Sequence, residues 1–276
     1  MKVITELRSH ACEIDYFRNI TKILKDELDD SFYFYEYNQG LYEYLPENVK
    51  KIKQNQTDIK KIALHCGNEF AESGFDNKLY EYFDLVFRFY QSENCDNKKI
   101  FEINIGYNSS GDNKIIFDNT KSMDSRENDV FFSGKIGGRN NFQQITKLKN
   151  PKYKINITPS FRGGYNINEY VNILSNSKIC LAPNGVSPQT FRYSEAFASG
   201  CIVITNVKFN TWYGKHSPAY VVNDWSEVTE EYIQEILNSD LEEERKKSIE
   251  YYEKYLSPHA NAEYILKVIT NKYHAQ

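Results

Sequence analysis

The feature that most constrains the fold of this chain is a regular alternation of apolar and amphipathic segments in its second half. Short apolar, β-prone segments lie at 130–136, 153–160, 178–185 and 201–206. The segments between them show helical spacing and lie at 140–148, 166–178 and 188–199. Strands that alternate with helices of about ten residues are typical of βαβ units, whose strands lie parallel in one sheet. One more strand is expected at 219–224, and mostly helix from about 229 to 272.

The first half is less regular but also mixes strands with a helix. Apolar spacing predicts a helix from Ile14 to Leu28. Strands are expected at 1–7, 31–37, 60–68, 84–90 and 99–107.

Between Asn108 and Asn128 the composition shifts to Asn, Asp, Ser and Lys, which indicates a domain boundary. A length of 276 residues accommodates two small α/β domains. We therefore expect Rossmann-like domains at 1–120 and 121–276, with C-terminal helices that pack back on the first domain.

Charge and hydropathy exclude several classes of function. The net charge is −4, and Lys and Arg are scattered along the chain, which argues against nucleic acid as the main partner. No apolar stretch approaches the roughly 18 residues that span a bilayer. The N-terminal MKVITELRSH lacks the apolar core of a signal peptide. A cytoplasmic protein is expected, with at most peripheral association at the inner face of the membrane.

The five cysteines are odd in number and irregular in spacing, at positions 12, 66, 95, 180 and 201. No two of them form a Cys-x-x-Cys pair, so the pattern indicates free thiols in a reducing compartment and no zinc site. No metal and no other cofactor is expected.

The passage from the strand at 178–185 into the helix at 188–199 carries the clearest ligand-binding signal. Turn-forming residues end the strand at 183–185, Ser187 suits an N-cap and Pro188 suits the first helical position. Ligands of open parallel sheets bind beyond the carboxyl ends of the strands, so this helix N-terminus is expected to face an anion such as a diphosphate. The candidate binding residues here are Asn184, Gly185, Ser187, Gln189 and Thr190.

Glu195 lies two turns into that helix, four residues after Phe191 and so on a partly apolar face. A carboxylate there needs a partner. Two partners fit the spacing: Arg192, three residues earlier, in a pair that only fastens the helix, or the diol of a ribose held by two hydrogen bonds.

Two further loops carry basic residues at strand ends. In SGKIGGRNN, residues 133–141, the glycines allow close backbone approach, and Lys135 and Arg139 bring positive charge. This loop matches neither a Walker A motif nor G-x-G-x-x-G, and glycine-rich turns without a ligand are common. Arg162, in the loop at 160–165, either frames a nucleotide base or is a plain surface residue.

The segment NEYVNILSNSKICLAPNGVSPQTFRYSEAFASGCIVIT resembles the C-terminal motif of exostosin-type glycosyltransferases. The shared order is a Tyr-bearing helix, a Ser-Lys-x-Cys-Leu-x-Pro strand end, a Gly turn, an Arg, a Glu-Ala pair and Gly-Cys-Ile. VFFSGKIGGRNN also looks like the segment that opens their nucleotide-binding domain. The resemblance covers about 130–206; residues 1–120 match no family that we can name.

This resemblance implies a GT-B fold, with two Rossmann-like domains facing across a cleft and the donor held by the C-terminal domain. It implies that Arg139 and Arg192 face the diphosphate of a nucleotide-sugar and that Glu195 faces the ribose. It also implies transfer of a sugar to a glycan or lipid-linked glycan acceptor without a metal. By class, assembly of a surface polysaccharide is expected.

An inverting transfer also needs a general base, expected from a strand-end loop of the N-terminal domain. The candidates are His65 and Glu69 after the most apolar strand of that half, followed by His10 and Glu6 after the first strand. A lone loop His or Glu is more often a hydrogen-bonded surface group, and a retaining enzyme needs no such base.

Two other classes of function stay open. One is a degenerate transferase fold that serves as a binding or scaffold protein. The other is a different nucleotide-using enzyme such as an epimerase, which the absence of an N-terminal G-x-G-x-x-G and of a Tyr-x-x-x-Lys pair disfavours.

Overall fold

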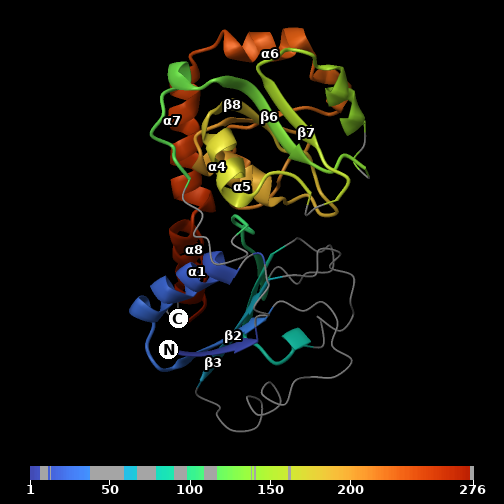
Figure 1. The fold of residues 1–276 in the computed structure, drawn as a ribbon. Helices are drawn as coiled ribbons and strands as arrows, with labels where there is room; N and C mark the ends of the chain where they lie inside the picture. Colours follow the sequence, from blue (N-terminus) through green and yellow to red (C-terminus); the bar gives the residue numbers. More distant parts are fainter. Residues whose placement is uncertain are drawn as a thin grey trace. The chain divides into compact units, whose positions relative to one another are not determined.

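The computed structural model divides the chain into two compact units, each built on one parallel sheet (Figure 1). The first unit comprises Met1–Gly111 and Pro258–Gln276, and the second comprises Asp112–Ser257. The residues described are 1–6, 12, 14–37, 59–66, 79–89, 98–108, 117–137, 139, 141–160 and 163–273; for residues 4–6 and 37 only the backbone is described.

The sheet of the first unit contains five parallel strands in sequential order. They are β1 (Lys2–Glu6), β2 (Phe32–Tyr37), β3 (Lys60–His65), β4 (Leu85–Arg88) and β5 (Ile100–Glu102). Because neighbouring strands follow one another along the chain, the order does not reverse anywhere among the described strands of this sheet.

Two helices from opposite ends of the chain pack together in the first unit. Helix α1 (Ile14–Glu27) buries Phe17, whose ring contacts that of Phe89 with centroids 5.1 Å apart. The C-terminal helix α8 (Pro258–Tyr273) lies beside α1 (Figure 1). Asn261 of α8 is fully buried and donates to the Tyr16 hydroxyl at 2.6 Å. This buried polar contact fixes α8 as part of the first unit.

The second sheet has the order that is typical of doubly wound folds. Its strands are β6 (Asn128–Gly134), β7 (Tyr153–Ile157), β8 (Ser177–Leu181), β9 (Ile202–Thr205) and β10 (Tyr220–Val221). All pairings are parallel, in the order β10-β9-β8-β6-β7. Counted from β6 this is 2-1-3-4-5, so the order reverses between β6 and β8. Such a switch point is where doubly wound sheets bind their ligands.

Alternation along the strands of the second unit buries both faces of the sheet. Phe131, Cys180 and Val203 face a cluster that includes residues of α4 (Ile167–Ser175), α5 (Phe191–Ala198) and α7 (Leu241–Tyr251). Their neighbours in sequence face a second cluster with α6 (Glu230–Leu237) and with 3₁₀ turns at Phe142–Lys147 and Trp225–Glu227. Further 3₁₀ turns lie at Met123–Ser125 and Gly214–His216.

The expected α/β fold with two parallel sheets and C-terminal helices is confirmed, but several elements differ from their expected form. The helix expected at 140–148 is a 3₁₀ turn. The helix expected at 188–199 begins only at Phe191. The mostly helical stretch expected at 229–272 is divided near Asp240, which caps α7, and again at Ser257 after a π-helical turn (Tyr252–Leu256). Ser257 is extended, as the residue before a proline prefers.

Candidate functional site

The candidate site lies at the carboxyl ends of β6 and β8, on either side of the switch point. Strand β6 ends at Gly134 and β8 at Leu181, and the loop after β8 leads into α5. Apart from Arg162, which lies outside the described residues, the residues that sequence analysis singled out in the second unit therefore lie on the loops and the helix that follow these strand ends.

Arg192, in the first turn of α5, reaches across to the end of β6. Its guanidinium donates to the Ser133 carbonyl and lies 4.7 Å from the centroid of the Phe132 ring. Gly134 permits this approach, because a Cβ at that position would lie 2.8 Å from Nη2 of Arg192. The backbone of Gly134 has φ +151°, which also favours glycine.

Arg139 brings a second guanidinium to the same ring. Its Nη1 donates to the Lys135 carbonyl at 2.6 Å, and its guanidinium carbon lies 5.9 Å from the Phe132 centroid. Burial, and then the positive charge of Arg192, lower the pKa of Arg139 to about 10. The Arg139 guanidinium therefore remains charged at neutral pH, although the charge of Arg192 repels it.

Among the described residues, no carboxylate forms an ion pair with either cation. None of the ion pairs among the described residues includes Arg139 or Arg192. Their bonding partners are main-chain carbonyls and aromatic rings. An anion bound between them would relieve the repulsion and gain two charge-assisted donors, which suits a phosphate or diphosphate.

Glu195 is held by a tyrosine and not by Arg192. The Tyr170 hydroxyl, from α4, donates to Oε2 of Glu195 at 2.7 Å, and Glu195 is only 4% exposed. Burial, together with the Glu195 charge, raises the pKa of Tyr170 well above its ordinary value, so the hydroxyl stays a donor. The Arg192–Glu195 pair considered from spacing is absent from the ion pairs of the described residues.

The loop between β8 and α5 is ordered by its own hydrogen bonds and by the end of β9. The main-chain N–H of Asn184 donates to Oδ1 of Asn206 at 3.0 Å, and Nδ2 of Asn206 donates to Oδ1 of Asn184 at 2.9 Å. The Gly185 amide donates to the Ser187 carbonyl at 2.9 Å.

The expected cap of α5 is wrong, because Thr190, not Ser187, is the residue before the helix. The Ser187 hydroxyl instead accepts from the Gln189 amide at 3.3 Å within the loop. Ser187 and Gln189 are buried, so their side chains shape this loop; Thr190 makes no side-chain cap bond.

The remaining candidates are distributed as follows. Lys135 is exposed and offers its carbonyl to Arg139. Arg162, Glu69 and His10, and the side chain of Glu6, lie outside the described residues. His65 ends β3 in the first unit; it is fully buried, with Nδ1 2.6 Å from the Tyr80 hydroxyl. A base role for His65 stays a prediction.

Sequence analysis missed three contributors to the second-unit site. Phe132 and Tyr170 appeared only as members of a strand and a helix, and Asn206 only as a strand end. The signal for Tyr170 was present in the family motif, whose helix bears a tyrosine. The contacts of Phe132 and Asn206 join residues 60 and 22 positions apart, and no local pattern reveals them.

The described residues contain neither a metal-binding cluster nor a helix that could span a membrane. Within them, no group of three or more His, Cys, Asp and Glu side chains is arranged to hold a metal ion. The cysteines at 12, 66, 180 and 201 are free thiols, and Cys95 lies outside the described residues. Among the helices that the structure describes, none combines the length and apolar character needed to cross a bilayer.

Comparisons with known proteins identify the fold. No protein-family model and no curated protein sequence matches this chain. The structure of TarM matches with a TM-score of 0.52 at 15% identity, over 90% of this chain and 57% of TarM. The N-terminal domain of Candida albicans trehalose-6-phosphate phosphatase matches with a TM-score of 0.50 at 9% identity, over 93% of this chain and 74% of that domain.

The pneumococcal O-GlcNAc transferase GtfA, solved in complex with UDP and GlcNAc, matches with a TM-score of 0.48 at 14% identity, over 92% of this chain and 60% of GtfA. The chain thus spans somewhat under two thirds of the length of GtfA and TarM. At such identities the likeness shows the fold alone. That fold is GT-B, as expected from the sequence.

Proposed function

We propose that this protein is a glycosyltransferase whose second unit binds a nucleotide-sugar, and that it moves the sugar to a hydroxyl of a glycan or lipid-linked glycan acceptor. The observation that carries the proposal is the pair of guanidinium groups, Arg139 and Arg192, on the Phe132 ring at the switch point. A diphosphate fits there because it would relieve the repulsion between two guanidinium groups that form no ion pair with a described carboxylate.

The position of Glu195 supports a nucleotide. It lies one turn after Arg192 on the same helix, and Tyr170 occupies one of its carboxylate oxygens. A carboxylate one turn from a phosphate-binding residue can accept both hydroxyls of a ribose. We propose that the ribose hydroxyls reach this carboxylate, which Tyr170 also holds.

In the proposed reaction the acceptor oxygen forms a bond to the anomeric carbon while the bond from that carbon to the diphosphate breaks. The leaving diphosphate takes the electron pair, and Arg139 and Arg192 stabilise the charge that develops on it. The acceptor proton passes to a base, which we place in the first unit. In this proposal, two cations at the leaving group perform the task that a divalent metal performs elsewhere, so the transfer is metal-independent. Because a separate base takes the acceptor proton, we propose that the transfer is also inverting.

Finer parts of the proposal rest on the sequence. The resemblance over 130–206 favours an exostosin-type enzyme that works in the cytoplasm on surface polysaccharide, with at most peripheral membrane association. The first unit, whose described strands show no switch point, is proposed as the acceptor side.

A thermal-shift panel of UDP, GDP, CDP and ADP tests the proposal on wild type, Glu195→Ala and the matched control Glu235→Ala. Glu235 is an exposed carboxylate on α6. One nucleotide should raise the melting midpoint of wild type and of the control but not of Glu195→Ala. No shift with any of the four would contradict the transferase proposal and favour the scaffold alternative.

A further inference from the structure

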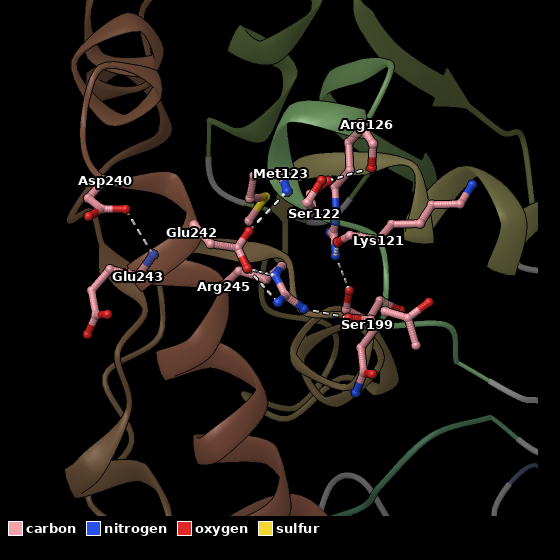
Figure 2. Close-up of polar contacts among 12 residues, drawn as sticks. Lys121, Ser122, Met123, Arg126, Ser199, Asp240, Glu242, Glu243 and Arg245 are labelled. Atoms are coloured by element: carbon pink, nitrogen blue, oxygen red, sulfur yellow. Dashed lines mark hydrogen bonds and ion pairs between the residues drawn. The ribbon is translucent and has the colours of Figure 1, made fainter.

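A buried arginine lies at the end of α5 opposite to the proposed donor site. Arg126 is 3% exposed; its Nη1 donates to the Ser177 carbonyl and its Nη2 to the Ser199 carbonyl, each at 2.8 Å (Figure 2). Ser199 is the C-cap of α5, and Ser177 follows the C-cap of α4. A cation is thus placed at the C-terminal end of α5, where the helix dipole is negative, and is also bonded to the first residue of β8.

The chain segment that carries Arg126 is fastened at further points. Nη2 of Arg126 also donates to the Lys121 carbonyl at 3.4 Å, and Nη1 of Arg245 donates to the Asn119 carbonyl at 2.6 Å. The Met123 amide donates to Glu242, which also pairs with Arg245 (Figure 2). Segment 119–126 is therefore bound to the C-terminal end of α5 and to the first turns of α7.

The turn after α5 leaves little room for movement. Gly200 has φ +67°, and a Cβ there would lie 3.2 Å from Nη2 of Arg126 and 3.1 Å from Cγ of Arg245. Helix α5 has only eight residues. A helix of two turns is too short to bend, so a displacement at Ser199 is passed to Arg192 and Glu195.

We propose that Arg126 is a positioning residue for the donor site. By holding the C-terminal end of α5 against α4 and segment 119–126, it sets where the side chains of Arg192 and Glu195 lie. It does so without contact with the nucleotide, and this inference rests on the proposed function. Removal of the guanidinium leaves the Ser177 and Ser199 carbonyls without this donor and allows α5 to slide along the sheet.

The test compares nucleotide affinity with stability in three variants. Arg126→Met removes the cation, and Arg126→Lys keeps the charge but cannot fork between two carbonyls. Lys178→Met is the matched control, because Lys178 forms a largely buried ion pair in the same unit, and its partner is Asp129, not a residue of α5. The ligand is whichever of UDP, GDP, CDP and ADP binds wild type most tightly. Its dissociation constant is measured by calorimetry at a temperature well below the melting midpoint of every variant.

The dissociation constant of Arg126→Met should rise by roughly tenfold or more, as expected for a misplaced binding group. That of Arg126→Lys should rise by a smaller factor, and that of Lys178→Met should stay within twofold of wild type despite a lower midpoint. The inference is overturned if the dissociation constant of Arg126→Met lies within twofold of the wild-type value. If Arg126→Met does not fold, the inference is overturned by a dissociation constant of Arg126→Lys that equals the wild-type value. Wild type that binds none of the four nucleotides refutes the proposed function itself.

Discussion

Gly134→Ala tests the geometry of the two-arginine site, because Gly134 makes room for Arg192. An alanine Cβ would lie 2.8 Å from Nη2 of Arg192, whereas ordinary contacts begin at 3.4 Å. The guanidinium must therefore retreat by about 0.6 Å, away from the Ser133 carbonyl and from the position opposite Arg139. A charged hydrogen bond is worth about 1.5–3 kcal/mol. Loss of one such bond, from Arg192 to the diphosphate, predicts a nucleotide affinity lower by roughly tenfold or more.

The same substitution should also lower stability, because φ +151° is strained for alanine. Such strain costs about 1–3 kcal/mol. For a unit of this size that is a fall of roughly 3–10 °C in the melting midpoint.

Gly137→Ala is the matched control for this substitution. A Cβ there meets only the flexible Lys135 side chain, at 3.4 Å, in the same loop. Calorimetric titration and thermal melts of both variants give the answer. If Gly134→Ala binds nucleotide as wild type and Gly137→Ala do, Arg192 is not where the diphosphate binds, and the reasoning is refuted.

Two more predictions concern buried contacts. Gly106→Ala should destabilise the first unit by about 3 kcal/mol or more, because its Cβ would overlap the Tyr16 ring and its backbone φ is +69°. An unchanged urea midpoint would show that α1, which carries Tyr16, moves aside without loss of stability. Tyr170→Phe removes the donor to the Glu195 carboxylate, which should cost about 1.5–3 kcal/mol of stability and also weaken nucleotide binding. Melting and titration curves that coincide with those of wild type would mean that Tyr170 does not support Glu195.

The strands of the second unit were predictable because their signal is local. Runs such as 179–182 and 201–204 are continuously apolar and lie next to turn formers, so burial on both faces is encoded in a few adjacent residues. The start of α5 was not predictable in this way. Ser187 and Pro188 form a sound helix start by composition, but the loop bonds of Asn184 and Gly185 delay the helix to Phe191.

Site residues that directly follow the end of a strand could be predicted from the sequence. Contacts between residues far apart in the sequence could not. Arg139, Arg192 and Glu195 follow from the strand-end rule and from the family motif. The sequence does not reveal that Arg139 and Arg192 share the Phe132 ring, because that contact joins β6, its following loop and α5. Arg126 gives no local signal, since the two carbonyls that it contacts at 2.8 Å lie 51 and 73 residues away.

The most direct test of the central claim is a calorimetric comparison of a nucleoside diphosphate with its monophosphate and its nucleoside, on wild type and on Arg139→Gln. If the diphosphate lies between Arg139 and Arg192, wild type should bind it at least about tenfold more tightly than the monophosphate, since the second phosphate gains a charge-assisted contact. Arg139→Gln should lose most of that preference. Equal affinities for diphosphate and monophosphate in wild type, or a preference that survives in Arg139→Gln, would contradict the account.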